Sequence, residues 1–182
     1  MASVVGVALV VGACSGGDGE GGGGLSVDGL RGAGDECPVD LAGSELAADD
    51  LGPVEVEVTE GTGEGELDDT ALDQAGGVYV ECRTAGADTV AVVYASEQPD
   101  ALALLLPRVQ SDLGLAADDL EVILAAYDDA GDGALVELGA EGPAAVVRLD
   151  VDGAESAVLY LSTVSATSRE VQDAAEDMAG AL

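Results

Sequence analysis

Alternating apolar and polar residues predict a strand with one solvated face near the start of the chain. Between Val54 and Val58, valine and glutamate take turns, and a period of two is typical of a half-buried strand. Further along, short runs rich in Val, Leu and Ala are bounded by Gly and Asp, which is typical of strands and their turns. These runs cover residues 78–83, 89–95, 121–127, 134–138, 144–150 and 156–163.

Turn sequences indicate how neighbouring strands pair. Residues 85–88, which read Ala-Gly-Ala-Asp, separate two predicted strands and favour a hairpin by their spacing. Asp152-Gly153 separates the last two strands, and this dipeptide is typical of a type I′ hairpin turn. Residues 59–70 are acidic and interrupted by glycine, so we expect a loop there.

A period near four residues predicts two longer helices. The first covers residues 99–113, and its apolar stripe consists of Leu102, Leu105, Leu106, Val109 and Leu113. The second follows Thr167, which forms a capping-box sequence with Glu170. The stripe of this second helix consists of Val171, Ala174, Ala175, Met178 and Leu182. Residues 44–51 are a candidate for a shorter helix.

The order of these elements predicts an α+β fold, with antiparallel strands and amphipathic helices on one face of the sheet. Two stretches also resemble each other, because each runs from a strand through a Gly-Ala turn and a second strand into a helix. The second strands carry Tyr94 and Tyr160 at matching places and continue to Ser96 and Ser162. We interpret them as two copies of a hairpin-plus-helix unit; chance in a Gly/Ala/Val-rich chain is the alternative.

Composition changes the picture of the core and of the partners. Hydrophobic residues make up 48% of the 182-residue chain, which is enough for one domain, but Phe and Trp are absent. The formal net charge is −32, and there is no Lys and no His. Such a field repels phosphate backbones, so we expect no nucleic-acid partner.

The missing residue types also exclude several kinds of active site. Without His there is no Ser-His-Asp triad, and without Lys there is neither Schiff-base chemistry nor a P-loop lysine. We therefore expect no enzyme and no cofactor. Asp128 and Asp132 are weak candidates for a calcium loop, since Gly133 follows at the expected place, but Gly139 stands where such a loop has its glutamate. An ordinary hairpin turn between strands is the favoured interpretation.

The first residues indicate export and anchoring. A short apolar run from Val4 to Val11 suits the core of a signal peptide and is too short to span a bilayer. It ends in Val11-Gly12-Ala13-Cys14, which resembles the lipobox of bacterial lipoproteins. The resemblance implies cleavage after residues 1–13 and diacylglycerol on Cys14. Residues 14–36 are then a flexible acidic tether with an r.m.s. span of roughly 25 Å, and residues 37–182 form a single domain.

A signal peptide normally begins with a basic residue. Because Met1-Ala2-Ser3 supplies none, we expect the true start codon to lie upstream.

The remaining two cysteines predict a disulfide. With Cys14 carrying lipid, Cys37 and Cys82 form an even pair in an oxidising compartment. The segment Cys37-Pro38-Val39-Asp40-Leu41, together with Cys82, is similar to the domain start in small lipoproteins of high-GC Gram-positive bacteria. That resemblance implies lineage and a location outside the cytoplasm, on the outer face of the cell membrane.

These features favour a non-enzymatic module of the cell envelope. Its first partner is the membrane, through the lipid. Its second partner is a protein, peptide or small-molecule ligand, and the acidic surface suits a positively charged one. A weak divalent-cation binder is the second hypothesis, and a hydrolase that uses carboxylates is the third.

Overall fold

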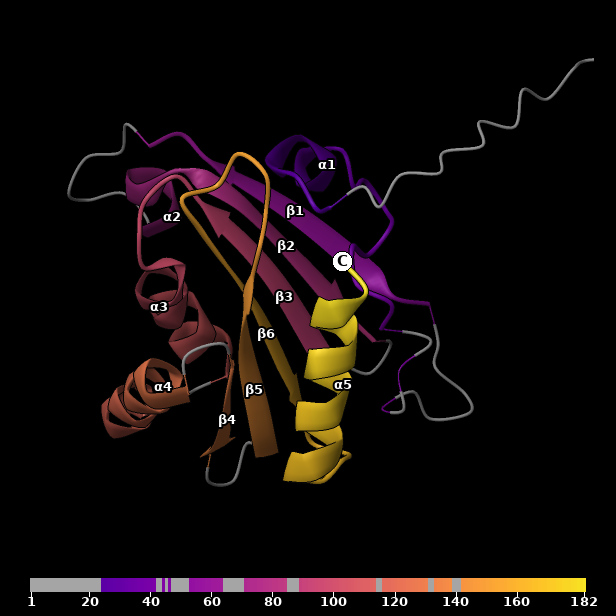
Figure 1. Ribbon diagram of the computed structural model, residues 1–182, viewed down its shortest axis with the longest axis vertical. Coiled ribbons are helices and arrows are strands. Elements are labelled where there is room, and N and C mark those ends of the chain that lie inside the picture. The colour runs from indigo at the N-terminus through magenta and orange to yellow at the C-terminus, as the bar shows by residue number, and fades with distance from the viewer. Residues whose placement is uncertain are drawn as a thin grey trace, which may run out of the picture.

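The computed structural model describes residues 24–41, 44, 46, 53–63, 71–84, 89–113, 116–130, 133–138 and 142–182. Within these residues, one six-stranded antiparallel sheet has the order β1-β2-β3-β6-β5-β4 (Figure 1). Its strands are β1 (Glu55–Gly61), β2 (Gly77–Arg83), β3 (Thr89–Ser96), β4 (Gly133–Leu138), β5 (Gly142–Leu149) and β6 (Ser156–Thr163). The helices are α1 (Val27–Arg31), α2 (Ala71–Ala75), α3 (Ala101–Leu113), α4 (Ala117–Ala130) and α5 (Ser168–Gly180). None of the helices in these ranges has the length and hydropathy needed to cross a bilayer.

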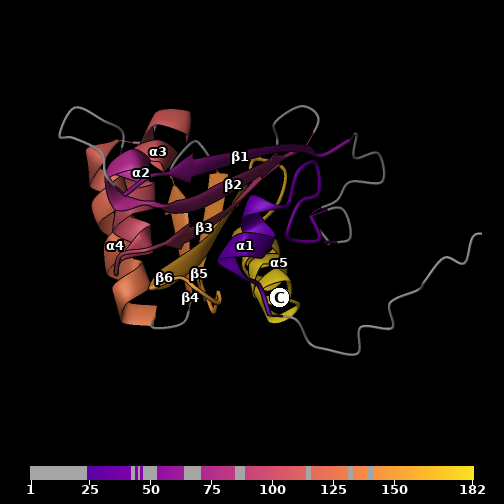
Figure 2. The ribbon, with the colours of Figure 1, turned by 90° about the horizontal axis from the view of Figure 1, so that it is seen from above.

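The α+β class and the antiparallel sheet are confirmed, but the placement of the helices on one face is wrong. Helices α1 and α5 cover one face, and α2, α3 and α4 cover the other (Figures 1 and 2). The described residues accordingly form two hydrophobic cores, one against each face. The physical reason is visible in β3, in which every residue is buried. A strand that is apolar on both sides needs cover on both sides, whereas exposed and half-buried residues alternate from Glu55 to Val58 in the edge strand β1.

The predicted strand at residues 121–127 is wrong, because these residues lie within α4. Leu120 and Leu124 are one helical turn apart and pack together against the core that lies under α3 and α4. Val122, between them in sequence, is exposed. The Val-Ile-Leu run therefore belongs to a helix with one apolar stripe. The strand prediction was wrong because β-branched residues are frequent in strands.

The predicted repeat holds for the hairpins and fails for the helices. Tyr94 lies opposite Val158, and Tyr160 lies opposite Val92. A twofold axis perpendicular to the sheet between β3 and β6 would produce this reciprocal pairing. Such an axis would also place the two following helices on the same face, but α3 and α5 lie on opposite faces. A duplicated hairpin-plus-helix unit is thus contradicted by the helices.

The connection from β5 to β6 is longer than a type I′ turn. The paired residues end at Leu149 and Ala157, and Gly153 has a positive φ of 86° while Asp152 does not. A type I′ turn requires positive φ at both central residues. Instead, the Asp152 carbonyl accepts from Val27 N at 3.0 Å, and Asp152 N donates to the Leu25 carbonyl at 2.8 Å. This loop therefore holds the N-terminal segment.

The folded domain begins earlier than residue 37, so the predicted tether of residues 14–36 is wrong in its second half. Ser26 caps α1 by accepting from Gly29 N at 3.0 Å, and Val27 and Leu30 are buried in the core. Arg31 forms an ion pair with Glu60 at 3.1 Å. A helix this short has no readable periodicity and depends on packing for its stability, which explains why the sequence pattern did not predict it.

The C-terminal helix follows its prediction closely. Thr167 and Glu170 form the capping box, and hydrogen bonds from Thr167 lower the pKa of the Glu170 carboxyl. The buried side chains of α5 are Val171, Ala174, Ala175 and Met178. The strands predicted at 54–58, 78–83, 89–95, 134–138, 144–150 and 156–163 and the helix at 99–113 are confirmed, with small shifts at their ends. Most of the helix predicted at 44–51 and the turn at 85–88 lie outside the described residues.

Candidate functional site

The predicted disulfide between Cys37 and Cys82 is confirmed. The two Cα atoms are 5.9 Å apart, and 45 positions separate the residues in sequence. Cys82 lies on β2 and is buried in the core, while Cys37 is half-buried. The bond therefore fixes the segment after α1 against the sheet, on the face that α5 also covers.

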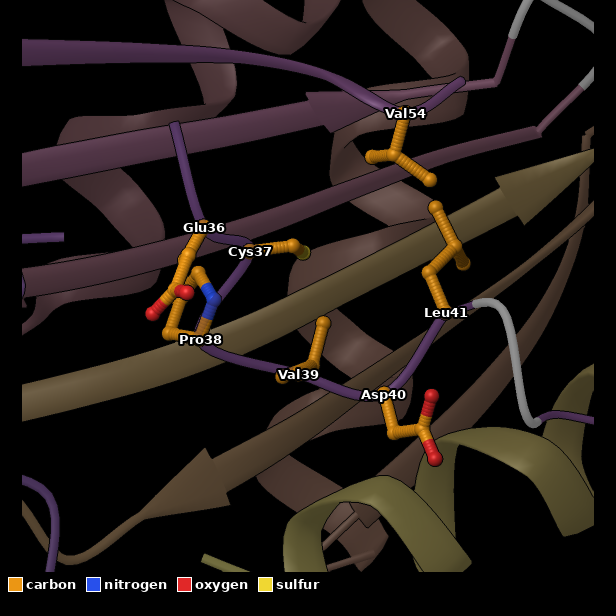
Figure 3. A pocket seen from close by; sticks show the side chains of 7 residues that line it. All are labelled: Glu36, Cys37, Pro38, Val39, Asp40, Leu41 and Val54. Atoms are coloured by element: carbon orange, nitrogen blue, oxygen red, sulfur yellow. The ribbon is translucent and has the colours of Figure 1, made fainter. Parts of the chain in front are cut away.

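A shallow hollow of about 450 Å³ lies beside this disulfide, and we name it the disulfide hollow. Its lining consists of Glu36, Cys37, Pro38, Val39, Asp40, Leu41 and Val54. In Figure 3, the side chains of Leu41 and Val54 point toward each other, whereas the carboxylates of Glu36 and Asp40 project away from Val54. Val39 and Leu41 are buried, and the two carboxylates are exposed. The hollow thus combines an apolar floor with an acidic rim.

A second hollow of about 370 Å³ adjoins the first. It shares Glu36, Cys37 and Pro38 with the disulfide hollow and extends to α1, where Gly29 and the capping residue Gly32 contribute to its wall. The segment between α1 and Leu41 therefore lines both hollows, and the disulfide holds it in place.

A buried polar network on the opposite face of the sheet was not predicted. Glu81 is 4% exposed; its carboxylate accepts from the Tyr79 hydroxyl at 2.9 Å and pairs with the Arg83 guanidinium. Glu57 lies directly opposite Glu81 on the edge strand β1, and Glu55 lies opposite Arg83. The sequence contains one signal of this network, namely a glutamate and an arginine within the otherwise apolar run of β2. Charged residues among core positions indicate a buried ion pair.

Three tyrosines share this face, and their hydroxyls differ in environment. The rings of Tyr79 and Tyr94 are 6.4 Å apart, and the Tyr94 hydroxyl donates to the Gly76 carbonyl at 3.1 Å. The Tyr160 hydroxyl is buried and has no hydrogen-bond partner in the structure as described. Burial raises the pKa of both Tyr94 and Tyr160. The Ser162 side chain lowers the Tyr160 pKa and so opposes part of this shift. The two hydroxyls nevertheless do not meet the geometry of a hydrogen bond.

The remaining predicted site residues are not brought together. Asp128 lies in the last turn of α4, which contradicts the interpretation of a turn between two strands, and Asp132 lies outside the described residues. Among the residues that the structure describes, no group of three or more His, Cys, Asp or Glu side chains is arranged to hold a metal ion. Cys14 also lies outside the described ranges.

Comparisons with protein-family models, with curated proteins and with solved structures give no match. Any functional assignment therefore rests on the residues and contacts of this chain.

Proposed function

We propose that this chain is a lipid-anchored extracytoplasmic binding module without enzymatic activity, which holds a cationic ligand with an apolar group in the disulfide hollow. The observation that carries the binding proposal is the pairing of an apolar floor, Val39, Leu41 and Val54, with the exposed carboxylates of Glu36 and Asp40. Ligand sites commonly combine an apolar lining with a few polar groups that orient the ligand.

Charge and size support a small cationic ligand. The net charge of −32 attracts cations to the surface and raises their local concentration. A volume of about 450 Å³ lies within the range of small-molecule sites. The Cys37–Cys82 bond keeps the lining segment in place, which reduces the entropy lost when a ligand binds.

Two sequence features support the location. The run Val11-Gly12-Ala13-Cys14 has the lipobox pattern, and two or more acyl chains give stable anchoring where one does not. A structural disulfide is also typical of proteins in an oxidising compartment. The absence of His and Lys removes the most frequent general base and the amine nucleophile, which supports a binding role over catalysis.

The anchor is tested by replacing Cys14 with serine in the full chain, expressed in a high-GC Gram-positive host. We expect the unchanged chain in the membrane fraction, cleaved before Cys14 and carrying a diacylglycerol mass, because the thiol is the acceptor. The Cys14→Ser variant should lose the lipid mass and leave the membrane fraction. The double variant Cys37→Ala/Cys82→Ala is the control and should remain lipidated. A chain expressed from the gene's own start codon and recovered without lipid, with residues 1–13 still attached, would refute the anchor.

Binding in the hollow is tested with leucine amide, which has an isobutyl group and a positive charge but no carboxylate. We expect binding to the full-length Cys14→Ser chain, with NMR shifts at Val39 and Val54, because the apolar group covers the floor. Exposed ion pairs contribute about 0.2–1 kcal/mol each, so Glu36→Gln/Asp40→Asn should weaken binding by about twofold to thirtyfold. The matched control is Glu121→Gln/Glu155→Gln, which removes two exposed carboxylates elsewhere. Equal binding of the anionic N-acetyl-leucine would contradict the proposal.

A further inference from the structure

Among the residues that the structure describes, the outer edge of β1 has no neighbouring strand. β1 pairs with β2 along its whole length, from Glu55 to Gly61, and forms one end of the described sheet. In the part of the chain that the structure describes, no backbone hydrogen bond reaches its other side. Figure 2 shows β1 as the outermost strand at this end. An extended edge with unpaired N–H and C=O groups can accept a further strand.

The opposite edge of the sheet is protected differently. There β4 is in contact with α4 on one face of the sheet and with α5 on the other. In contrast, β1 is in contact with two short helices, α1 and α2, each of five residues. Gly61 at the end of β1 lies against the backbone carbonyl of Leu72 in α2. Within the described ranges, the body of β1 between these contacts is therefore the edge that is left for a partner.

The side chains of β1 specify the partner. Glu55 and Glu57 are exposed on one face, and Val56 and Val58 are half-buried on the other. Glu57 also lies directly opposite Glu81, and like charges at opposite positions of two strands are destabilising. Arg83 pairs with Glu81 and compensates part of this charge. A cation beside Glu57 would compensate more of it, so a basic residue is favoured at that place.

We propose that β1 binds an extended basic peptide of a partner protein, which adds to the sheet as a further strand. The peptide has basic residues at alternate positions, facing Glu55 and Glu57, and apolar residues between them, facing Val56 and Val58. Backbone hydrogen bonds supply affinity in this mode of recognition, and the alternate side chains supply specificity. The inference rests on the proposed binding role of the chain and assigns it a second surface, separate from the disulfide hollow.

Charge argues against a second copy of this chain as the occupant. Two β1 strands that meet edge to edge would bring Glu55 and Glu57 beside the same glutamates of the other copy. Each copy also carries a formal net charge of −32, and the repulsion between like charges at an interface costs affinity. A peptide with alternating basic residues reverses the sign of both interactions.

The probe is the peptide acetyl-Lys-Val-Lys-Val-Lys-Val-Lys-amide, with the full-length Cys14→Ser chain as receptor and NMR titration as the measurement. We expect shifts at the amides of β1 and saturable binding that weakens with added salt. The same peptide with every backbone amide N-methylated keeps its charge but donates no backbone hydrogen bond from either edge, so it should bind at least tenfold more weakly. Equal binding of the methylated peptide would overturn the proposal, because charge attraction alone would then explain the affinity.

Variants separate this surface from the hollow. Glu55→Gln/Glu57→Gln should weaken peptide binding about tenfold, whereas the matched Glu121→Gln/Glu155→Gln variant should leave it unchanged. Glu36→Gln/Asp40→Asn should also leave peptide binding unchanged, and leucine amide should not compete.

Loss of peptide binding in the Glu36→Gln/Asp40→Asn variant would place the peptide in the hollow and refute the β1 site. If leucine amide fails to bind while the peptide binds at β1, the hollow proposal fails and the strand proposal stands. A concentration-dependent dimer in sedimentation, accompanied by NMR shifts at the amides of β1, would show that β1 binds a second copy and would also refute the peptide.

Discussion

Replacing Cys37 and Cys82 together by alanine is expected to lower the free energy of unfolding by about 4 kcal/mol, which corresponds to roughly 10 °C in Tm for a domain of this size. The bond closes a loop with a sequence separation of 45 residues, and loss of this constraint increases the entropy of the unfolded chain. Urea denaturation of the full chain, followed by circular dichroism, measures the change. This loss is a large share of the net stability because a core without Phe or Trp gains less from each buried side chain.

Reduction provides an independent control for the cysteine experiment. The unchanged chain, treated with a thiol reductant, should unfold at nearly the same urea concentration as the Cys37→Ala/Cys82→Ala variant. Cys14→Ser removes a cysteine without removing the bond and should leave the midpoint unchanged. A double variant as stable as the oxidised chain would show that packing, and not the covalent bond, holds the segment around residue 37 on the sheet.

Changing Tyr160 to phenylalanine is expected to stabilise the protein by about 1–2 kcal/mol, since an unsatisfied buried polar group carries a desolvation penalty of that order. The Tyr160 hydroxyl is buried without a partner among the described residues, and phenylalanine keeps the ring. Tyr94→Phe is the matched control, because the Tyr94 hydroxyl donates to the Gly76 carbonyl at 3.1 Å. That variant should be destabilised by about 1 kcal/mol. Equal losses in the two variants would show that the Tyr160 hydroxyl is also bonded, for example to an internal water.

The same residue has a signature at alkaline pH. Burial raises the pKa of Tyr160 above its value in the unfolded chain, so the folded state favours the neutral phenol. Its contribution is fully present below the unfolded pKa of about 10 and is lost as pH rises through the folded value. Stability should therefore decline above pH 10 in the unchanged protein, and less steeply in Tyr160→Phe. Tyr94, whose pKa burial also raises, accounts for part of the decline that remains.

The sequence allowed the strands and the class of the fold to be predicted, because strand signals are local. Alternation in β1, the apolar runs of β2, β3 and β6, and the capping box at Thr167 each lie within a few residues. The layering of the helices could not be predicted in this way. Only the pairing of strands shows that β3 is central, and a central strand requires helices on both faces.

The candidate site was predictable only in its covalent part. Counting cysteines was sufficient for Cys37 and Cys82, since the expected export of the chain and the expected lipid on Cys14 leave these two to pair. The acidic rim of the hollow was not predictable, because Glu36 and Asp40 are two of 37 acidic residues and acquire their place from the disulfide. Likewise, Glu57 lies beside Glu81 only because β1 pairs with β2. The two strands are joined by a connection of more than ten residues, so a local sequence pattern does not reveal this pairing.

The attachment of α1 to the sheet determines how the domain would respond to mechanical load. With Cys14 in the membrane as proposed, a pull on the domain arrives at Leu25 and first loads its hydrogen bond with Asp152 N. Rupture there would release α1 and the ion pair between Arg31 and Glu60. Unravelling would then stop at Cys37, because the covalent bond passes the force directly to β2. About a dozen residues can therefore lengthen under tension while the sheet and its other helices remain folded.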